Sequence, residues 1–351
     1  MNYFRRVGFL SVILISIFSI SACGQQNQQQ QTTTEDTESQ VQDVQTVTLK
    51  GASAFPQGLR ESHGYETFVE ILTSEYPDYF DVEYVGGPDA FSPNELAEAV
   101  RSGAVDIANI TGVYYGGMAP MAKAMVIPDI PPWEWRRNGI FDFFDKVHQR
   151  HNIKYMGRTY SGIPYHCYTQ QRMTQPEDFE GKDIRTSPVY RPMLNHFGAN
   201  PVTTPPGEVY TALDRGVVNG FCWPAAGTID FGWHEKVNYR IDPGFFDVEV
   251  SLLMNLDQWN NLSDAHKERA MRAAEMMERQ TYYWFQREAV AEEKRLQEAG
   301  VEIVEFTGEA KQRYLDAAHE QYWEMLNEQA QEEDVEELRQ LLEQARKQKA
   351  E

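Results

Sequence analysis

Two segments of the sequence share one pattern, in which a helix stops at glycine and leads into a short apolar strand. "ELAEAVRSGAVDIANI" covers residues 95–110, and "EVYTALDRGVVNGFCW" covers residues 208–223. In both, an acidic residue begins the helix, and a basic residue, a glycine, an apolar pair and Asp or Asn lead into the strand. Glycine is common at any helix C-terminus, so coincidence is the competing explanation. We interpret the segments as equivalent parts of two similar halves, with a ligand bound between them.

Strand and helix signals alternate around both segments. The order strand, helix, strand, helix, strand is typical of an α/β domain with a largely parallel sheet, whose ligands collect at strand ends. Ser92 as N-cap, followed by Pro at the first helical position, marks one helix start. The predicted strands are 47–53, 80–88, 104–110, 180–187, 199–204 and 217–223, and the predicted helices are 64–77, 92–103, 188–198 and 206–216.

A long helix is predicted over residues 263–300, with Ser263 as its cap and Gly300 as its stop. At 1.5 Å per residue it would be about 55 Å long, which exceeds the width of one small domain. We therefore expect it to lie across two domains. A strand at 301–306 and charged helices follow. The segment 332–348 is amphipathic, which suits a solvated terminal helix or a helix that pairs two copies of the chain.

The N-terminal segment has the features of an export signal. Arg5 and Arg6 precede an apolar run over residues 7–20, and "ISAC" then places small residues before Cys23. The run is shorter than the roughly 20 residues needed to span a bilayer. "ISAC" resembles the lipobox of bacterial lipoproteins, which implies a signal peptide at 1–22 and a lipid on Cys23; plain secretion with a free Cys is the alternative. The polar tract at 23–46 is predicted to be a disordered tether.

The chain is strongly acidic, and this restricts its partners. Its formal charge is −21, and loss of residues 1–22 removes two arginines and brings it to −23. Such a surface repels nucleic acid and anionic headgroups, so no nucleic-acid partner is expected. The remaining residues suffice for two domains. Besides Cys23 the chain has Cys167 and Cys222, which are either free and buried or joined in a disulfide.

Three motifs in fixed order point to a family. "PEDFEGKDIR" at 176–185, "FGANPV" at 197–202 and "GEVYTALDRGVVNG" at 207–220 resemble the extracytoplasmic solute-binding proteins of tripartite ATP-independent periplasmic (TRAP) transporters, dicarboxylate-binding (DctP) type. The resemblance extends from about Val47 to the end of the long helix. It implies a two-domain, type II-like periplasmic-binding-protein fold of the α/β class with hinge strands, closing around an organic acid that a TRAP membrane permease receives.

The resemblance and the strand order together give a domain division. The first domain comprises 47–165 and 225–262. The second comprises 166–224 and 300–351, and the helix at 263–299 bridges the two.

Arg185 is the principal candidate for a ligand contact. In the family, the Arg that ends the "GK-x-I-R" strand binds the ligand carboxylate, and Arg185 is the matching residue. A guanidinium is a planar fork that donates two parallel hydrogen bonds to a carboxylate and stays charged when buried. The usual role of an Arg in so acidic a chain is a surface ion pair. Trp223, just beyond the matching strand, is either a pocket wall or part of the core.

Five further residues are candidates for the pocket. Tyr165 and His166 lie where sugar-acid-binding relatives carry a second Arg, and their presence argues against sugar acids. Tyr114 and Tyr115 follow a strand of the first domain, and Phe55 follows "GASA". Packing in loops is the alternative for each of these aromatic residues. The predicted ligand is a monocarboxylate, 2-oxo acid, aromatic acid or C4-dicarboxylate.

Metal and cofactor sites are not expected. Some 2-oxo-acid-binding relatives bind a cation through a Glu directly before the matching Trp, and this chain has Cys222 there, a poor ligand for sodium. His148 and His151 have helical spacing, but we interpret them as a solvated helix end.

Enzymatic function is not expected either. The sequence contains no G-x-S-x-G, G-x-x-x-x-G-K-[ST], G-x-G-x-x-G or H-E-x-x-H motif. A secreted hydrolase and a periplasmic sensor for a signalling partner remain the alternatives to a lipid-anchored transport receptor outside the cytoplasmic membrane.

Overall fold

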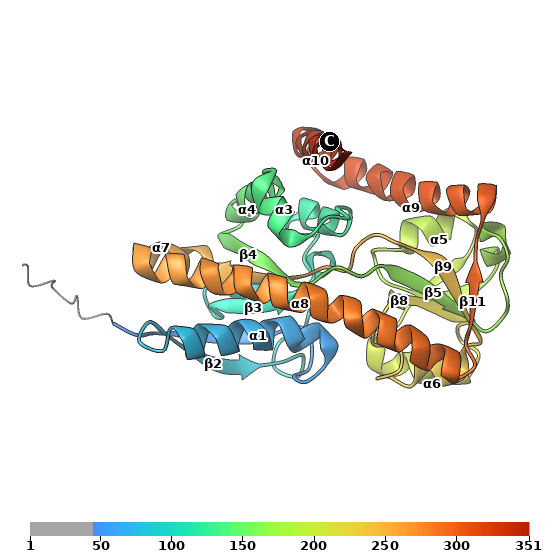
Figure 1. Ribbon diagram of the computed structural model, residues 1–351, viewed down its shortest axis with the longest axis horizontal. Helices are drawn as coiled ribbons and strands as arrows, with labels where there is room; N and C mark the ends of the chain where they lie inside the picture. Colours follow the sequence, from blue (N-terminus) through green and yellow to red (C-terminus); the bar gives the residue numbers. More distant parts are fainter. Residues whose placement is uncertain (1–44, 351) are drawn as a thin grey trace, which may run out of the picture. The chain divides into compact units, whose positions relative to one another are not determined.

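The computed structural model describes residues 45–350 (Figure 1). The predicted signal peptide at 1–22, the lipidation site Cys23 and the tether up to residue 44 lie outside the described residues. Within them the fold is mixed α/β with two sheets, as predicted. No helix in this described part is long and apolar enough to cross a membrane.

The first sheet is built mainly from the N-terminal third of the chain. Its strands are β1 (Val47–Ser53), β2 (Phe80–Gly86), β3 (Ile107–Ile110), β4 (Ile153–Tyr160) and β10 (Val250–Asn255). Their order is β2-β1-β3-β10-β4. β1 is parallel to β2 and β3, whereas β10 is antiparallel to both β3 and β4.

The second sheet repeats this arrangement. Its strands are β5 (Tyr165–Thr169), β6 (Asp183–Thr186), β7 (Asn200–Thr203), β8 (Gly220–Pro224), β9 (Tyr239–Phe245) and β11 (Glu302–Glu305). Read from β7, the order is β7-β6-β8-β5-β9, with β11 added at the edge. β6 is parallel to β7 and β8, and β5 is antiparallel to β8 and β9. The two predicted halves are therefore equivalent in topology.

Helices connect and cover the strands. The α-helices are α1 (Arg60–Glu75), α2 (Leu96–Arg101), α3 (Pro132–Arg137), α4 (Ile140–Gln149), α5 (Arg191–His196), α6 (Val209–Asp214), α7 (Leu256–Asn261), α8 (Asp264–Glu298), α9 (Gly308–Gln329) and α10 (Glu332–Ala350). The 3-10 helices are η1 (Gly112–Tyr114), η2 (Pro120–Val126), η3 (Pro176–Phe179), η4 (Pro206–Glu208) and η5 (Trp233–Lys236). We call the first sheet with its helices the first lobe, and the second sheet with α5 and α6 the second lobe.

Several predicted element starts are wrong by three or four residues. The strands predicted at 104, 180 and 217 begin at 107, 183 and 220, and the α-helices predicted at 64, 92, 188 and 206 begin at 60, 96, 191 and 209. Regular helix α2 begins at Leu96, because residues 92–95 form a turn in which the Ser92 carbonyl accepts hydrogen bonds from Glu95 and Leu96. Strand β8 begins at Gly220 and not at Val217. The backbone N–H of Val217 donates to the carbonyl of Ala212, so this residue belongs to the end of α6.

The chain passes between the lobes at two strand connections and along one helix. The connections are 161–164, between β4 and β5, and 246–249, between β9 and β10. The predicted assignment of 225–262 to the first domain is therefore wrong up to residue 245, because β9 pairs with β5. Nothing in the local sequence reveals which sheet a single strand joins.

Helix α8 bridges the two lobes, as predicted. The Ser263 hydroxyl caps it by accepting a hydrogen bond from the His266 backbone. In Figure 1 the helix runs diagonally past α1 and β4 to β11. Its buried side chains include Ala273 and Met277, which pack with Phe68 and Leu72 of α1 in the core of the first lobe.

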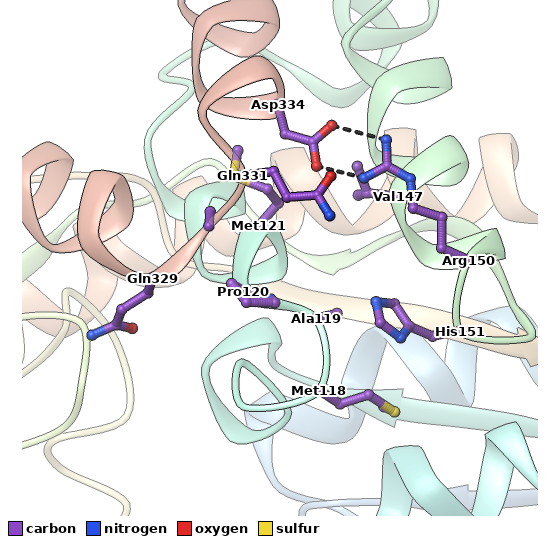
Figure 2. Close-up of a pocket in the computed structure, with 11 residues that line it drawn as sticks. Met118, Ala119, Pro120, Met121, Val147, Arg150, His151, Gln329, Gln331 and Asp334 are labelled. Carbon is purple, nitrogen blue, oxygen red and sulfur yellow. Dashed lines mark hydrogen bonds and ion pairs between the residues drawn. The ribbon is translucent and has the colours of Figure 1, made fainter.

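The C-terminal helices also contact both lobes. α9 packs against α5, but α10 packs against α4 of the first lobe, so the predicted placement of all of 300–351 in the second domain is wrong for α10. Figure 2 shows the ion pair of Arg150 with Asp334 that joins α10 to the end of α4. Val335, Leu338 and Leu342 are buried within the chain. The amphipathic face of 332–348 is thus used for packing inside the chain.

Cys167 and Cys222 form a disulfide. They are opposite each other on the antiparallel strands β5 and β8. The sequence left open whether these two cysteines are free or joined, and in the structure they are joined. A disulfide is typical of proteins outside the reducing cytoplasm.

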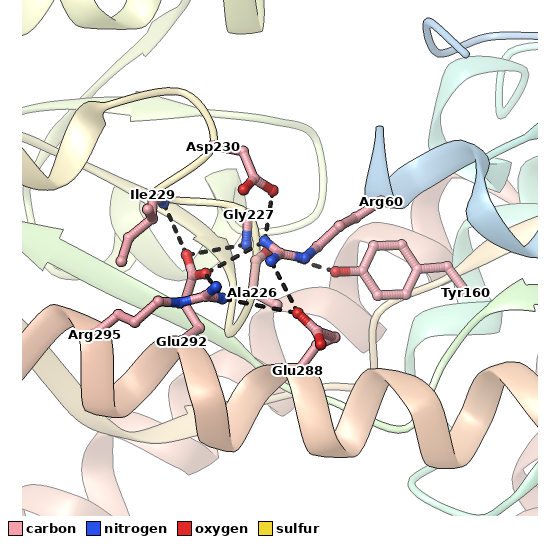
Figure 3. Close-up of polar contacts among 9 residues, drawn as sticks. All are labelled: Arg60, Tyr160, Ala226, Gly227, Ile229, Asp230, Glu288, Glu292 and Arg295. Atoms are coloured by element: carbon pink, nitrogen blue, oxygen red, sulfur yellow. Dashed lines mark hydrogen bonds and ion pairs between the residues drawn. The ribbon is translucent and has the colours of Figure 1, made fainter. Parts of the chain in front are cut away.

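Charged side chains join the lobes beside α8. Arg60, at the start of α1, forms ion pairs with Asp230 after β8 and with Glu288 and Glu292 of α8 (Figure 3). We call these four residues the Arg60 cluster. Glu292 is fully buried and also accepts hydrogen bonds from the backbone N–H groups of Gly227 and Ile229. The cluster therefore ties α1, α8 and the loop after β8 together.

Replacing Arg60 with Met should lower the free energy of unfolding by about 3 kcal/mol, because Asp230, Glu288 and the buried Glu292 all lose their ion pair with it, and Glu292 keeps only Arg295 as a cationic partner. Urea unfolding measures this change. The matched control is Arg101→Met, since Arg101 pairs with Glu98 at the surface with both side chains about half exposed. The control should leave the unfolding midpoint nearly unchanged. Equal effects of the two substitutions would contradict the structural role of the cluster.

Candidate functional site

A small cavity lies where the two lobes meet, and its volume is about 60 Å³. The carboxyl ends of parallel strands β1, β3, β6 and β8 supply part of its wall, as expected for ligand sites in α/β folds. The segments that cross between the lobes supply the rest. The lining residues are Phe55, Glu61, Thr111, Val113, Tyr114, Tyr160, Tyr165, Arg185, Ser187, Val189, Tyr190, Trp223, Pro224, Val248, Glu249 and Val250.

Arg185 projects into this cavity from the end of β6. Its side chain is 5% exposed, and its Nε donates to the Thr204 carbonyl at 3.1 Å. Its Nη1 lies 3.3 Å from the Tyr190 hydroxyl, and its Cζ lies 5.0 Å from the ring centre of Trp223. Within the described residues no carboxylate pairs with it. A surface ion pair is therefore not its role in this structure, and its charge faces the cavity without a counterion.

Trp223 is both a wall of the cavity and part of the core, the two roles between which the sequence did not decide. One ring face lies under the Arg185 guanidinium, a cation–π contact that stabilises a buried cation. The ring also packs at 4.9 Å against Trp233 in the second lobe. Its Nε1 is buried and has no hydrogen-bond acceptor among the described residues. The indole is thus part of the core and also lines the cavity.

Glu61, in the first turn of α1, brings a second charged group to the cavity. It is 5% exposed, and its Oε1 has no hydrogen-bond partner in the described structure. The pKa of its carboxyl is raised to about 7, and burial is the main cause. The backbone N–H of Glu61 acts to lower this pKa, and the charge of Asp230 acts to raise it. By contrast, Glu249 is satisfied by the Thr111 hydroxyl and the Gly112 N–H.

The structure brings five of the seven predicted site residues to the cavity: Phe55, Tyr114, Tyr165, Arg185 and Trp223. Phe55 and Tyr114 come from the first lobe, and their ring centres are 6.1 Å apart. Tyr165 packs against Tyr190 at 5.6 Å. The aromatic wall therefore draws on both lobes.

Two predicted residues lie outside the lining. The Tyr115 ring is buried in the first lobe, and its hydroxyl lies 2.8 Å from Nε2 of His148. His148 is itself fully buried, so its interpretation as part of a solvated helix end is wrong. Nδ1 of His166 lies 3.0 Å from the Ile241 carbonyl and 3.2 Å from Asp242, which holds β5 to β9.

Eleven lining residues were not predicted from the sequence, among them Glu61, Tyr160, Tyr190 and Glu249. The sequence predicted the first helix to begin at residue 64, so Glu61 lay outside any predicted element and gave no distinct signal. Tyr190 follows the predicted strand that ends in Arg185, and this position was a usable signal. Tyr160 and Glu249 flank the crossing segments, which the sequence did not identify.

One larger surface hollow carries less binding chemistry. The hollow in Figure 2, with a volume of about 470 Å³, lies between η2, the end of α4 and the start of α10. Its charged residues Arg150 and Asp334 are paired with each other. The smaller cavity holds the cation without a counterion and is the stronger candidate.

Metal ligands are not grouped in the described residues. No three His, Cys, Asp or Glu side chains there are arranged to hold a metal ion. The Cys222 sulfur, at the position where a cation ligand was considered, is bonded to Cys167.

Comparison with known proteins places the chain in a sequence family. The family described as "Bacterial extracellular solute-binding protein, family 7" (DctP) matches residues 66–329, which is more than half of the chain. The monocarboxylate 2-oxoacid-binding periplasmic protein of Nostoc sp. is 22% identical over 248 residues, covering 67% of this chain and 67% of that protein. The ectoine-binding periplasmic protein TeaA of Halomonas elongata is 24% identical over 205 residues, covering 52% of this chain and 56% of that protein.

Solved structures share the fold. A TRAP periplasmic solute-binding protein from Pseudoalteromonas atlantica, with bound sodium and pyruvate, has a TM-score of 0.75 at 15% identity. The likeness covers 87% of this chain and 95% of that chain. At this identity the comparison establishes the architecture of two α/β domains.

Replacing Glu61 with Gln should stabilise the unliganded protein at alkaline pH. The pKa of Glu61 is about 7 in the folded state, above the usual value of 4.5, so the folded carboxyl holds its proton more tightly. Ionising it as the pH rises from about 4.5 to 7 therefore costs the wild type up to about 3 kcal/mol of stability, a cost absent from the Gln variant.

Urea unfolding at pH 4.5 and pH 8 measures this difference. The gain from Glu61→Gln should be small at pH 4.5 and large at pH 8. A gain that does not depend on pH would show that the Glu61 carboxyl is not held in an unfavourable environment.

Proposed function

Because the chain belongs to family 7 of the bacterial extracellular solute-binding proteins, we propose that it is the receptor of a TRAP transporter and binds the carboxylate of an organic acid through Arg185. The cavity between the lobes is the proposed binding site. The permease of the transporter is the proposed recipient of the bound acid.

One observation carries this proposal. Arg185 is buried in a chain with 53 acidic residues, yet no described carboxylate pairs with it. A buried guanidinium without a counterion is costly unless a ligand supplies the negative charge. A ligand carboxylate bound through two parallel hydrogen bonds would meet this requirement.

The names of relatives support an organic acid but not one particular acid. One is named for monocarboxylate 2-oxo acids and another for ectoine, and a structural neighbour holds pyruvate. The cavity, at about 60 Å³, accommodates a handful of water-sized groups and so favours a compact acid over a sugar acid.

Closure of the lobes is the proposed mechanism. A ligand that contacts Arg185 and Trp223 of the second lobe and Phe55 and Tyr114 of the first lobe binds the closed arrangement better than an open one. Exclusion of water from the cavity strengthens the contact between the carboxylate and the guanidinium. The Arg60 cluster adds contacts between the lobes in the closed arrangement.

Anchoring and the absence of catalysis belong to the proposal as well. The lipid on Cys23 rests on the sequence motif, and it would anchor the receptor to a membrane outside the cytoplasm. The bound acid is proposed to be released unchanged, because the family binds solutes. Recovery of chemically unaltered acid after incubation tests this against the hydrolase alternative.

Substituting Arg185 with Lys should weaken acid binding by roughly 10- to 100-fold, because the ammonium keeps the charge but loses the planar fork. Arg185→Ala should weaken it further. Isothermal titration calorimetry with the acid that most raises the melting temperature in a screen measures both. Arg215→Lys, at an exposed position after α6, is the matched control and should bind as the wild type does. Equal affinities for the wild type and the Arg185 variants would contradict the proposed site.

A further inference from the structure

We propose that the acid bound in this cavity also carries a cationic nitrogen, with its carboxylate on Arg185 and its N–H group on Glu61. The ligand class is then a compact zwitterion, such as a small or cyclic amino acid. The inference rests on the proposed function and names the substrate class of that same site.

The position of Glu61 is the first reason. Its carboxyl is 5% exposed and lines the cavity, and Oε1 has no hydrogen-bond donor in the described structure. A buried carboxyl oxygen left unsatisfied is costly, and native structures rarely keep one without a role. A donor on the ligand would satisfy it.

The surroundings of Glu61 are the second reason, because negative charges outnumber positive ones among the described groups that act on it. Asp230 and Glu292 act on Glu61 as like charges, and Arg60 acts as an opposite charge. The guanidinium of Arg60 is itself bonded to the carboxylates of Asp230, Glu288 and Glu292, so it offsets this environment only in part. An ammonium group compensates this negative environment, whereas a hydroxyl group supplies a donor without charge.

The geometry of the two charges is the third reason. The guanidinium of Arg185 lies over the ring of Trp223. The indole Nε1 of Trp223 and Oε1 of Glu61 are both close to Gly227, at 3.1 Å and 3.7 Å from the position that a Cβ atom would take on that residue. One indole ring therefore extends from the guanidinium to the neighbourhood of the carboxyl. Tyr114 lines the cavity together with both groups. The guanidinium and the carboxyl group thus both line one small cavity, so a compact ligand that fills the cavity can contact both.

The hydrogen bonds of Glu249 explain why the ligand N–H group is assigned to Glu61 and not to Glu249. Glu249 also lines the cavity, but the Thr111 hydroxyl, the Gly112 N–H and the Ser251 hydroxyl donate to it. It has no comparable need of a ligand donor.

Matched sets of acids test the inference on the full chain by calorimetry and thermal shift. Each set keeps one chain length of two to five carbons, or one five-membered ring. Its members differ only in the group or ring atom bonded to the α-carbon of the carboxylate. Alanine, lactate, pyruvate and propionate form one set. Proline, tetrahydrofuran-2-carboxylate and cyclopentanecarboxylate form another. Each set is measured with the wild type, Glu61→Gln and Arg185→Lys.

The expected result is that amine-bearing members bind at least tenfold more tightly than their oxo, hydroxy or unsubstituted partners. Glu61→Gln should weaken the amine-bearing members at least tenfold and change the other members by less than threefold. Arg185→Lys should weaken all members. The melting temperature of unliganded Glu61→Gln shows that the variant is folded.

Two outcomes would overturn the inference in different ways. If oxo or unsubstituted acids bind as tightly as the amines, or if Glu61→Gln affects every member equally, the zwitterion assignment fails while the receptor function stands. If no acid binds, either in these sets or in the wider screen, or if binding ignores Arg185→Lys, the proposed function fails and the inference fails with it.

Discussion

The site depends on one electrostatic constraint, a buried guanidinium that has no counterion among the described residues of a strongly acidic chain. Arg185 is held by the Thr204 carbonyl, the Tyr190 hydroxyl and the face of Trp223, all of which orient it without neutralising it. Each of these contacts stabilises a cation only in part. The remaining charge faces the cavity, where an anionic ligand gains most from it because little water competes.

The duplicated topology explains why this charge lies between two lobes. β1-α1-β2-α2-β3 and β6-α5-β7-α6-β8 have the same strand order, and the carboxyl ends of their parallel strands contribute to one cavity. Two crossing segments, α8 and the Arg60 cluster join the lobes. The same cluster pairs Arg60 with three carboxylates, so this cation offsets the negative charge around Glu61 only in part. A structural contact between the lobes thereby sets the chemistry of the site.

Local patterns predicted much of this arrangement. Strand β1 and the Ser263 cap of α8 could be predicted from short stretches, because strand periodicity and helix capping are encoded by neighbouring residues. The Arg185 position followed from a family motif. The sheet membership of β9 and the packing of α10 on α4 could not be predicted, since both depend on contacts between residues far apart in the chain.

In the candidate site, too, some residues could be predicted from local sequence and others depend on contacts between distant parts of the chain. Arg185 and Trp223 lie at strand ends, where the sequence pattern points. Glu61 becomes distinctive only once burial and the commitment of Arg60 to other carboxylates are known. Tyr115 and His166 were predicted by proximity in sequence, but neighbouring residues on a turn or strand point in different directions, and both pack elsewhere.

A crystal structure of the protein with the acid that stabilises it most would test the central claim most directly. The account predicts a carboxylate bound by two N–H groups of Arg185, between the Tyr190 hydroxyl and the Trp223 ring, with residues of both lobes around it. A ligand carboxylate bound elsewhere, with Arg185 still bonded to Thr204 and Tyr190 alone, would contradict it.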